Sequence, residues 1–214
     1  MTRDAKQEAM TSEKRPELRV VRPMTPSSSG LPSRSKDDDA ELVRLFQRGH
    51  ADAAIEIYNA HATVAERMLV RMLGYVPERV DLLHDVFVRV YEGLDSIRDA
   101  SSLRSWICGI AVRRAQEHIR ERKRRQAASF EEHTAWTGDP EVSLTMRRVY
   151  ALLDRLDADD RAAFVLRRIE GMELAEVAST CGVSLATAKR RIARAEQQFS
   201  ELASADAVLR EKVS

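Results

Sequence analysis

Apolar residues recur every three to four positions along most of this chain, which is the spacing of amphipathic α-helices. One such block covers residues 37–125, with breaks at Gly49-His50 and between Gly74 and Pro77. A second block covers residues 143–204. The alternation that marks β-strands is weak throughout, so the pattern predicts an all-α protein.

The apolar periodicity disappears between and around these two blocks. Residues 1–36 hold four of the six prolines and the run Ser27-Ser28-Ser29-Gly30, and residues 126–142 contain Gly138-Asp139-Pro140. Turn-forming residues without apolar periodicity are typical of tails and linkers. We therefore predict two small helical domains, residues 37–125 and 143–204, joined by a flexible linker at 126–142. A disordered tail at 1–36 and a short tail at 205–214 would flank them.

The second block contains the pattern of a helix-turn-helix. A short apolar stripe ends at Ala178, Gly182 stands where a tight turn needs a positive φ, and Ser184 stands where a helix N-cap belongs. The helix that follows has one apolar face, made of Leu185, Ala188, Ile192, Ala195, Phe199 and Leu202. In this motif the second helix enters the DNA major groove.

The opposite face of that helix is small and basic. It shows Ala186, Arg190 and Arg194, with Thr187 beside them and Lys189 and Arg191 on the flanks. Arginine can fork onto a guanine edge, while flanking cations hold phosphates. We predict that this face, together with Ser184, binds DNA; the alternative is a helical hairpin with a solvated basic face.

A second basic helix is predicted at residues 102–125. Two apolar stripes on different sides wedge its first half between neighbours, and one further face carries Arg113, Glu117, Arg120 and Arg124. A loop of small polar residues, including Ser101 and Ser102, precedes it, and Trp106 follows. Such a loop beside an aromatic ring could hold an unstacked base, although the spacing of Trp106 also fits the core.

The helix predicted at residues 80–94 has an acidic outer face. Asp81, Asp85 and Arg89 lie opposite a wide apolar face, with Val88 at its margin. Acidic groups repel DNA phosphates, and apolar margins beside charge suit a protein partner. A plain surface face with pairing between Asp85 and Arg89 is equally compatible with the sequence.

The distribution of charge changes the meaning of the nearly neutral total. The formal net charge is +1, from 35 basic and 34 acidic residues. Residues 37–99 carry a net −6, whereas residues 100–125 carry +6 and residues 183–197 carry +3. The neutral total is thus a cancellation between acidic blocks and basic helices, which suits an adaptor between a protein and DNA.

Several classes of protein are excluded by the same sequence. We expect no membrane insertion, because the sequence has no run of about 18 apolar residues. Two cysteines and five scattered histidines lack metal-type spacing, so we expect no metal site, no cofactor and no enzymatic activity. These features and the lack of a secretory signal fit the cytoplasm.

Three segments, in this order, resemble bacterial RNA polymerase sigma factors of the extracytoplasmic-function class. The polymerase-binding helix of that family is similar to residues 81–98, DLLHDVFVRVYEGLDSIR. Its helix for the promoter −10 element is similar to residues 102–125, SLRSWICGIAVRRAQEHIRERKRR. Its domain for the −35 element is similar to residues 153–195, which include the helix-turn-helix.

The resemblance implies a function and a set of contacts. The protein would bind core RNA polymerase and direct initiation from promoter DNA, and an anti-sigma factor would be a further partner. Contacts to the clamp helices of the largest polymerase subunit would come from Asp81, His84, Asp85, Val88 and Arg89. The −10 element would meet Ser101, Ser102, Trp106, Arg113, Glu117, Arg120 and Arg124. The −35 element would meet Ser184, Ala186, Thr187, Lys189, Arg190, Arg191 and Arg194.

Several positions depart from the family pattern. His84 stands where glutamine is usual, Arg113 where asparagine is common, Leu103 where an aromatic residue is frequent and Ala188 where a β-branched residue is usual. From the residues alone, a stand-alone helix-turn-helix regulator that binds duplex DNA without polymerase is the alternative function.

Overall fold

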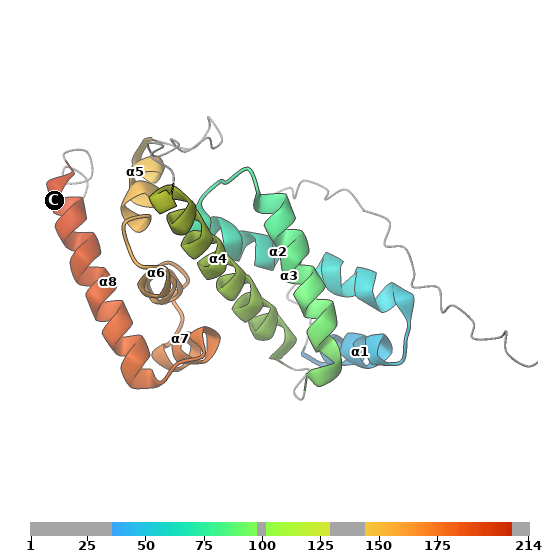
Figure 1. Ribbon diagram of the computed structural model, residues 1–214. Helices are drawn as coiled ribbons and strands as arrows, with labels where there is room; N and C mark the ends of the chain where they lie inside the picture. Colours follow the sequence, from blue (N-terminus) through green and yellow to red (C-terminus); the bar gives the residue numbers. More distant parts are fainter. Residues whose placement is uncertain (1–35, 98–101, 129–143, 207–214) are drawn as a thin grey trace, which may run out of the picture. The chain divides into compact units, whose positions relative to one another are not determined.

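The computed structural model describes residues 36–97, 102–128 and 144–206, and these residues form helices and connections without any strand (Figure 1). The all-α prediction is therefore confirmed. Residues 1–35 of the tail predicted at 1–36, Ser101, residues 129–142 of the linker predicted at 126–142, and residues 207–214 lie outside the described residues. Residues 126–128, predicted as the start of the linker, instead continue the last turn of a helix, and Lys36, predicted as the end of the tail, begins one. The helices are α1 (Lys36–Gln47), α2 (Ala51–Leu73), α3 (Arg79–Gly93), η1 (Leu94–Ser96), α4 (Leu103–Ala128), α5 (Leu144–Leu153), α6 (Ala158–Phe164), the π-helical turn η3 (Val165–Ile169), α7 (Leu174–Cys181) and α8 (Leu185–Ala205).

The two breaks predicted in the first block occur where expected, and glycine makes both. Gly49, with φ of 83°, separates α1 from α2, and Gly74, with φ of 77°, ends α2. A positive φ is costly for residues with a Cβ, so glycine allows each turn at low strain.

Helices α1, α2 and α3 form one packed group. Asp39, in the first turn of α1, lies buried and hydrogen-bonds to Nε2 of His61 on α2 at 3.1 Å. The rings of Tyr58 on α2 and Phe87 on α3 lie 4.6 Å apart. Leu82 and Leu83 on α3 are also buried, at 2% and 4% exposed.

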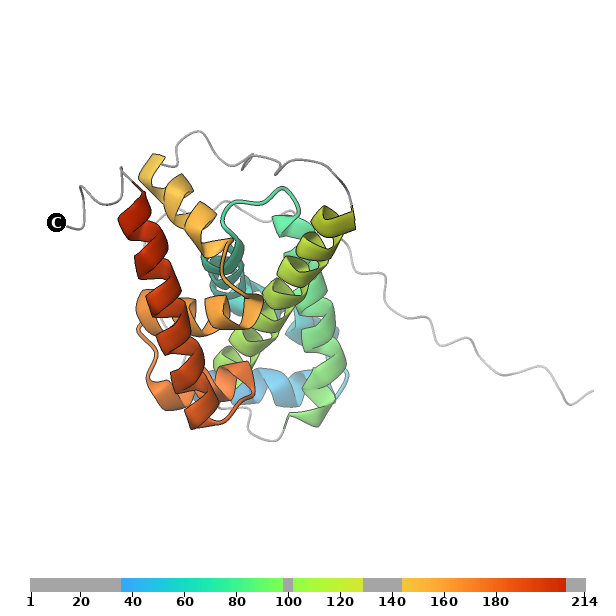
Figure 2. The ribbon, with the colours of Figure 1, turned by 60° about the vertical axis from the view of Figure 1, so that its left-hand side comes forward.

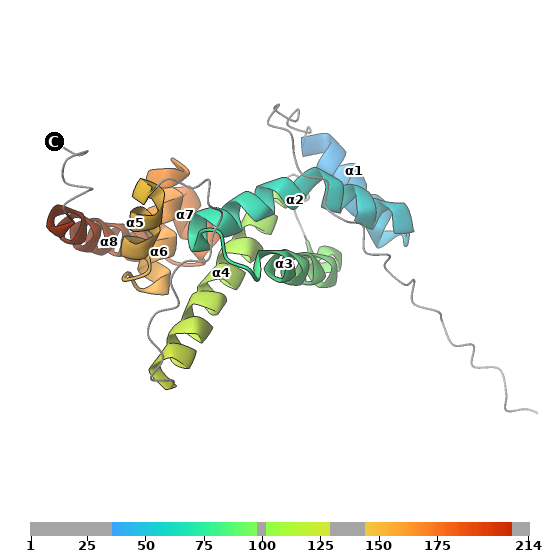
Figure 3. The ribbon, with the colours of Figure 1, turned by 90° about the horizontal axis from the view of Figure 1, so that it is seen from above.

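Helix α4 is the central element, because it is covered on two sides. It packs against α2 and α3 on one side and against α6 and α7 on the other (Figures 1 and 3). Both predicted apolar stripes are buried, since Ile107 and Val112 are each at most 1% exposed. The wedged position predicted for the first half of this helix is thus confirmed.

Helices α6 and α7 lie between α4 and α8, as Figure 2 also shows. Asp157 caps α6 by accepting a hydrogen bond from the backbone N–H of Asp159 at 2.9 Å. The rings of Phe164, at the end of α6, and Phe199 on α8 stack with their centroids 5.0 Å apart. Leu185, which the helical pattern placed on the apolar face of α8, is 54% exposed, whereas Ala188, Ile192 and Ala195 of that face are buried. It is the first residue of α8.

Candidate nucleic-acid interface

The turn between α7 and α8 is built as the sequence predicts. Gly182 adopts the left-handed conformation, with φ of 65° and ψ of 36°. Its N–H bonds to the carbonyl of Ser179 at 3.1 Å, and the N–H of Val183 bonds to that of Ala178 at 2.9 Å. This pair of bonds is a Schellman motif, which satisfies the last carbonyls of α7. Ser184 then caps α8, because its Oγ accepts from the N–H of Thr187 at 3.2 Å.

Fewer residues of α8 project freely into solvent than the sequence suggested. Ala186, Lys189 and Arg190 are exposed and share one side of the helix. Arg191 and Arg194 turn toward α6, where they meet two carboxylates.

Those two carboxylates belong to the first turn of α6. Arg191 Nη2 lies 2.7 Å from Asp159, and Arg194 donates two hydrogen bonds, of 2.5 and 2.6 Å, to Asp160. Asp160 is 2% exposed, and its hydrogen bonds raise the pKa of Arg194. These ion pairs anchor α8 to α6 within the helix-turn-helix segment.

The predicted face of α4 mixes exposed cations with one engaged carboxylate. Arg113, Arg120 and Arg124 are exposed. Glu117 receives two hydrogen bonds from Arg89 of α3, at 2.9 and 2.7 Å. Hydrogen bonding to Arg89 lowers the pKa of Glu117, and the same bonds raise the pKa of Arg89. Glu117 therefore belongs to a bridge between α3 and α4.

Trp106 lies partly buried against the end of α3. A Cβ on Gly93 would come within 2.8 Å of the indole ring, so the absence of a side chain there lets the ring approach the backbone closely. Ser102, at the start of α4, is exposed. The tryptophan thus packs on the core and also reaches the surface beside this serine.

The outer face of α3 is exposed, as the prediction of a partner surface requires. Asp81, His84, Asp85 and Val88 all lie on it, and Val88 is 52% exposed. Asp85 accepts a hydrogen bond from Nε of Arg114 on α4 at 3.0 Å. Asp85 and Arg89, two of the five residues predicted to contact polymerase, thus also form hydrogen bonds with side chains of α4.

Sequence reasoning missed Asp159. Its carboxylate accepts from Gln116 at 3.0 Å and from Arg120, both on α4, in addition to Arg191 on α8. The acidic run around this residue does signal a helix N-terminus. It carries no sign of the partners, because they come from helices distant in the sequence.

Within the described part of the chain, no group of three or more His, Cys, Asp or Glu residues could hold a metal ion. None of the helices there is both long enough and apolar enough to cross a membrane.

These features define a class of protein. A capped helix-turn-helix with exposed Lys189 and Arg190, preceded by a helical segment with a basic α4, is the architecture of an all-helical DNA-binding protein. Residues 57–125 match Sigma-70 region 2, and residues 146–199 match Sigma-70, region 4.

Curated relatives agree with both matches. The chain is 28% identical over 177 residues to the ECF RNA polymerase sigma factor SigM of Mycobacterium tuberculosis, covering 81% of this chain and 88% of SigM. It is 29% identical over 177 residues to the ECF RNA polymerase sigma-E factor of Escherichia coli K12, covering 74% and 91%. The RNA polymerase sigma-H factor of Pseudomonas aeruginosa is 25% identical over 182 residues, with 78% and 94% covered.

The chain also resembles the solved structure of CnrH in complex with the cytosolic domain of CnrY, with a TM-score of 0.56, 26% identity and coverage of 79% and 99%. A structure of RpoE from Bartonella quintana, at 23% identity and a TM-score of 0.55, has the same fold over 80% of this chain and 99% of RpoE. The chain belongs to the extracytoplasmic-function class of the sigma-70 family, and it is an RNA polymerase sigma factor. Proteins of this family are transcription initiation factors that bind core RNA polymerase and promoter DNA.

Proposed function

We propose that three separate surfaces carry the sigma-factor activity, and that the first is the exposed face of α8, which reads the promoter −35 element. Ser184 orders the first turn of α8, and Ala186, Lys189 and Arg190 follow on its open side. Arg190 can reach a base edge while Lys189 neutralises a phosphate. Thr187 contributes its backbone N–H to the cap. Arg191 and Arg194 would contact DNA after their hydrogen bonds to Asp159 and Asp160 break. This exposed capped helix is the observation that carries the proposal.

The second proposed surface is the outer side of α4, which faces the −10 element. Arg113, Arg120 and Arg124 are exposed there and would meet phosphates of the opened strands. Trp106, half-buried beside Ser102, would support a base captured at the start of the helix. The part of Ser101 in this capture stays a prediction. Glu117, bonded to Arg89, would orient the helix and not contact a base.

The third proposed surface is the outer side of α3, which binds the clamp helices of the largest polymerase subunit. Asp81, His84 and Asp85 give it polar character, and Val88 adds an exposed apolar centre. Apolar contact surrounded by charge is typical of specific protein interfaces. Arg89 would act through its bonds to Glu117, fixing the angle between the polymerase-binding and promoter-binding helices.

We further propose an anti-sigma factor as a regulatory partner and the cytoplasm as the place of action. A solved relative is bound to another protein domain, the cytosolic domain of CnrY. Residues 37–125 and 143–204 would act as separate domains during initiation, with the predicted linker at 126–142 between them.

Run-off transcription with purified core polymerase tests this proposal. The full-length chain and core enzyme are incubated with genomic promoter fragments, and transcripts are mapped to their start sites. Specific transcripts that depend on both proteins are expected. If the chain forms no complex with core enzyme but retards duplex DNA in a gel by itself, the proposal is wrong. The protein would then be a stand-alone DNA-binding regulator.

A further inference from the structure

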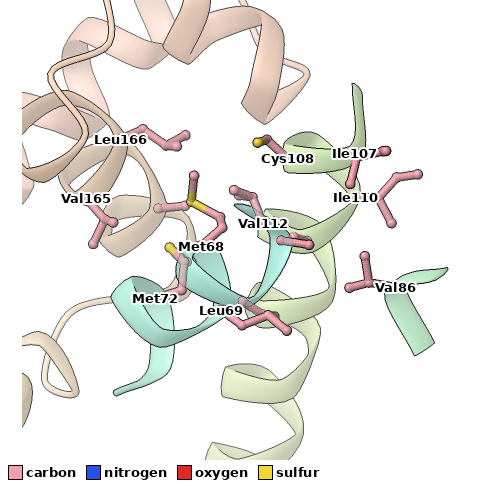
Figure 4. Packing of buried hydrophobic residues seen from close by; sticks show 14 of the residues in the cluster. Met68, Leu69, Met72, Val86, Ile107, Cys108, Ile110, Val112, Val165 and Leu166 are labelled. Carbon is pink, nitrogen blue, oxygen red and sulfur yellow. The ribbon is translucent and has the colours of Figure 1, made fainter. Parts of the chain in front are cut away.

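A cavity of 410 Å³ is lined by residues of α2, α4 and α7. One apolar wall includes Met68 of α2 and Cys108 of α4, which are 3% and 6% exposed and belong to the buried core (Figure 4). Val64, Met172 and Ala175 extend the apolar lining. Pockets that take small molecules usually measure about 300–1,000 Å³ and combine apolar walls with a few polar groups. The cavity therefore has the size and the apolar wall that an organic ligand needs.

Two cations that line this cavity have no partner in the described part of the chain. They are Arg67 on α2 and Arg104 on α4, and both are exposed. Neither forms a hydrogen bond or an ion pair with another described residue. The neighbouring Arg71, in contrast, pairs with Glu170. Two guanidinium groups from different helices are thus available to an anion in the cavity.

The charges of these two arginines act on the same wall of the cavity. Burial raises the pKa of the Cys108 thiol, and the positive charges of Arg104 and Arg67 oppose that rise. Burial and the charge of Arg67 also lower the pKa of Arg71. A positive charge lowers the pKa of a thiol only when it lies close to it in space. Arg67 and Arg104 therefore both lie near the wall that Cys108 forms.

Two carboxylates also line the cavity, and each already has a partner. Glu170 is neutralised by its ion pair with Arg71. The carboxylate of Glu176 accepts a hydrogen bond from the backbone N–H of Glu173 at 2.8 Å, within the capping box of α7. The two unpaired arginines thus outnumber the one remaining carboxylate, and the cavity has an excess of positive charge.

Hydroxyl groups complete the polar side of the lining. Ser105 comes from α4, and Ser179 and Thr180 come from α7. Hydroxyl and guanidinium groups both donate hydrogen bonds to oxygen atoms, and the planar guanidinium fits carboxylate and phosphate groups. A metal cation would be repelled by the unpaired arginines, and an inorganic anion would leave the apolar wall without contact. The lining therefore favours a molecule that is anionic at one end and apolar at the other.

We propose that this cavity binds a small organic anion, with a carboxylate or phosphate head group on an apolar body. The head group binds Arg67 and Arg104, and the apolar body packs against Met68 and Cys108. None of these four residues belongs to the three surfaces proposed above for sigma-factor activity. The site therefore adds a small-molecule ligand to the polymerase and the promoter DNA.

Isothermal titration calorimetry of the full-length chain with phenyl phosphate and with benzoate tests this proposal. Phenol and inorganic phosphate are the controls, because each supplies only one half of the ligand. At least one of the two organic anions should bind with saturation, and both controls should bind at least about tenfold more weakly. The tighter of the two anions identifies the head group. No saturable heat from either anion up to about 1 mM, or equally tight binding of phenol, overturns the proposal.

Variants then test the assigned residues. Arg67→Ala and Arg104→Ala should each weaken binding by about tenfold, because each removes a charged donor. Arg48→Ala, which removes an exposed arginine outside the cavity, is the matched control and should leave binding within about twofold. Circular dichroism checks that every variant keeps its helices. Binding that survives unchanged in both cavity variants rules out the assigned anion site.

A change of shape tests the apolar part of the site. Ala175→Phe, at an exposed position that lines the cavity, should abolish binding by filling the space. Ala151→Phe, the same change at an exposed position of α5 outside the cavity, should have no effect. Equal binding by these two variants would contradict the proposed location.

The thiol of Cys108 gives a second measurement of location. The Cys181→Ala chain keeps Cys108 as its single thiol. Saturating phenyl phosphate or benzoate, whichever binds, should slow alkylation of this thiol by N-ethylmaleimide, and an equal concentration of inorganic phosphate should not. An unchanged rate would show that the anion binds elsewhere and would overturn the proposal.

None of these measurements uses polymerase or DNA, which separates this inference from the proposed function. A chain that binds the anion at this site but directs no transcription would refute the sigma-factor surfaces and leave the site standing. A chain that directs transcription but binds no organic anion would do the reverse.

Discussion

Arg89 of α3 donates two parallel hydrogen bonds, of 2.9 and 2.7 Å, to the carboxylate of Glu117 on α4. This pair joins the helix with the proposed polymerase surface to the helix with the proposed −10 surface. Two-pronged arginine–carboxylate bonds hold a fixed orientation more strictly than a point charge would. The two surfaces are therefore geometrically coupled, and the first prediction concerns the strength of that coupling.

A double-mutant cycle with Arg89→Ala and Glu117→Ala should give a coupling free energy of at most about 1 kcal/mol. The two side chains are 40% and 39% exposed, so solvent screens much of the attraction. Urea unfolding of the four proteins measures it. Arg113→Ala, which removes an exposed cation from the same helix, is the control and should change stability by less than about 0.5 kcal/mol. A cycle that closes to zero would show that the bridge adds no stability.

The same pair predicts a dependence of stability on pH. Hydrogen bonding to Arg89 holds the pKa of Glu117 below its ordinary value of 4.5. A carboxyl with a depressed folded-state pKa stabilises the fold above its unfolded pKa and loses that contribution as the pH falls through the folded value. The difference in unfolding free energy between the parent and Glu117→Gln should thus be constant above about pH 5 and shrink below it. A difference that grows on acidification contradicts the assignment.

Ser184→Ala should destabilise the protein by about 1 kcal/mol, because the N–H of Thr187 loses its acceptor at the start of α8. Ser200→Ala, an exposed position within the same helix, is the matched control and should be nearly neutral. Thermal unfolding followed by circular dichroism gives both values. Equal stability of the two variants would mean that the capping bond contributes nothing in solution.

Gly93→Ala should cost about 1–3 kcal/mol, since the new methyl group would stand 2.8 Å from the Trp106 ring. The backbone is not the cause, because φ at Gly93 is −96°, which alanine adopts readily. The double variant Gly93→Ala with Trp106→Leu should recover part of the loss relative to Trp106→Leu alone. Chemical unfolding measures the stabilities, and tryptophan fluorescence of the single variant should report a displaced ring. Full additivity of the two changes would exclude the clash.

Arg190→Glu should reduce run-off transcription from a −35-dependent promoter by tenfold or more, which is the order expected when a base contact worth about 1–3 kcal/mol is replaced by a repulsive charge. Arg155→Glu makes the same change on the connection between α5 and α6 and should leave transcription nearly unchanged. Binding of core enzyme, measured by co-elution, should be equal in both variants. Unchanged output from Arg190→Glu would remove this residue from the proposed −35 face.

Local signals explain which parts of the fold could be predicted. Three turns are marked by glycines with a positive φ, namely Gly49, Gly74 and Gly182. A glycine between two helical patterns can be recognised in the sequence without knowledge of the fold. Ser184 could be assigned as a cap for the same reason, since its partner lies three residues away. Helical spacing places Leu185 on the apolar face of α8 but does not predict its exposure of 54%, because burial depends on which residues of that face the neighbouring helices cover.

The residues of the candidate site also differ in whether local sequence signals could predict their arrangement. The exposure of Lys189 and Arg190 on one side of α8 follows from helical spacing alone. The pairing of Glu117 with Arg89 does not follow from the sequence, because nothing near either residue in the chain indicates its partner.

By itself, the sequence determined the helical class, the positions of the turns, the helix-turn-helix and the existence of acidic and basic helices, all of which depend on contacts within a few residues. Only the tertiary structure decided which charges remain available. Asp159 brings together Arg120 and Arg191, which are 71 positions apart in the chain. Whether two groups so distant lie within hydrogen-bonding range depends on how whole helices pack, and packing is settled by buried apolar surface and not by local pattern.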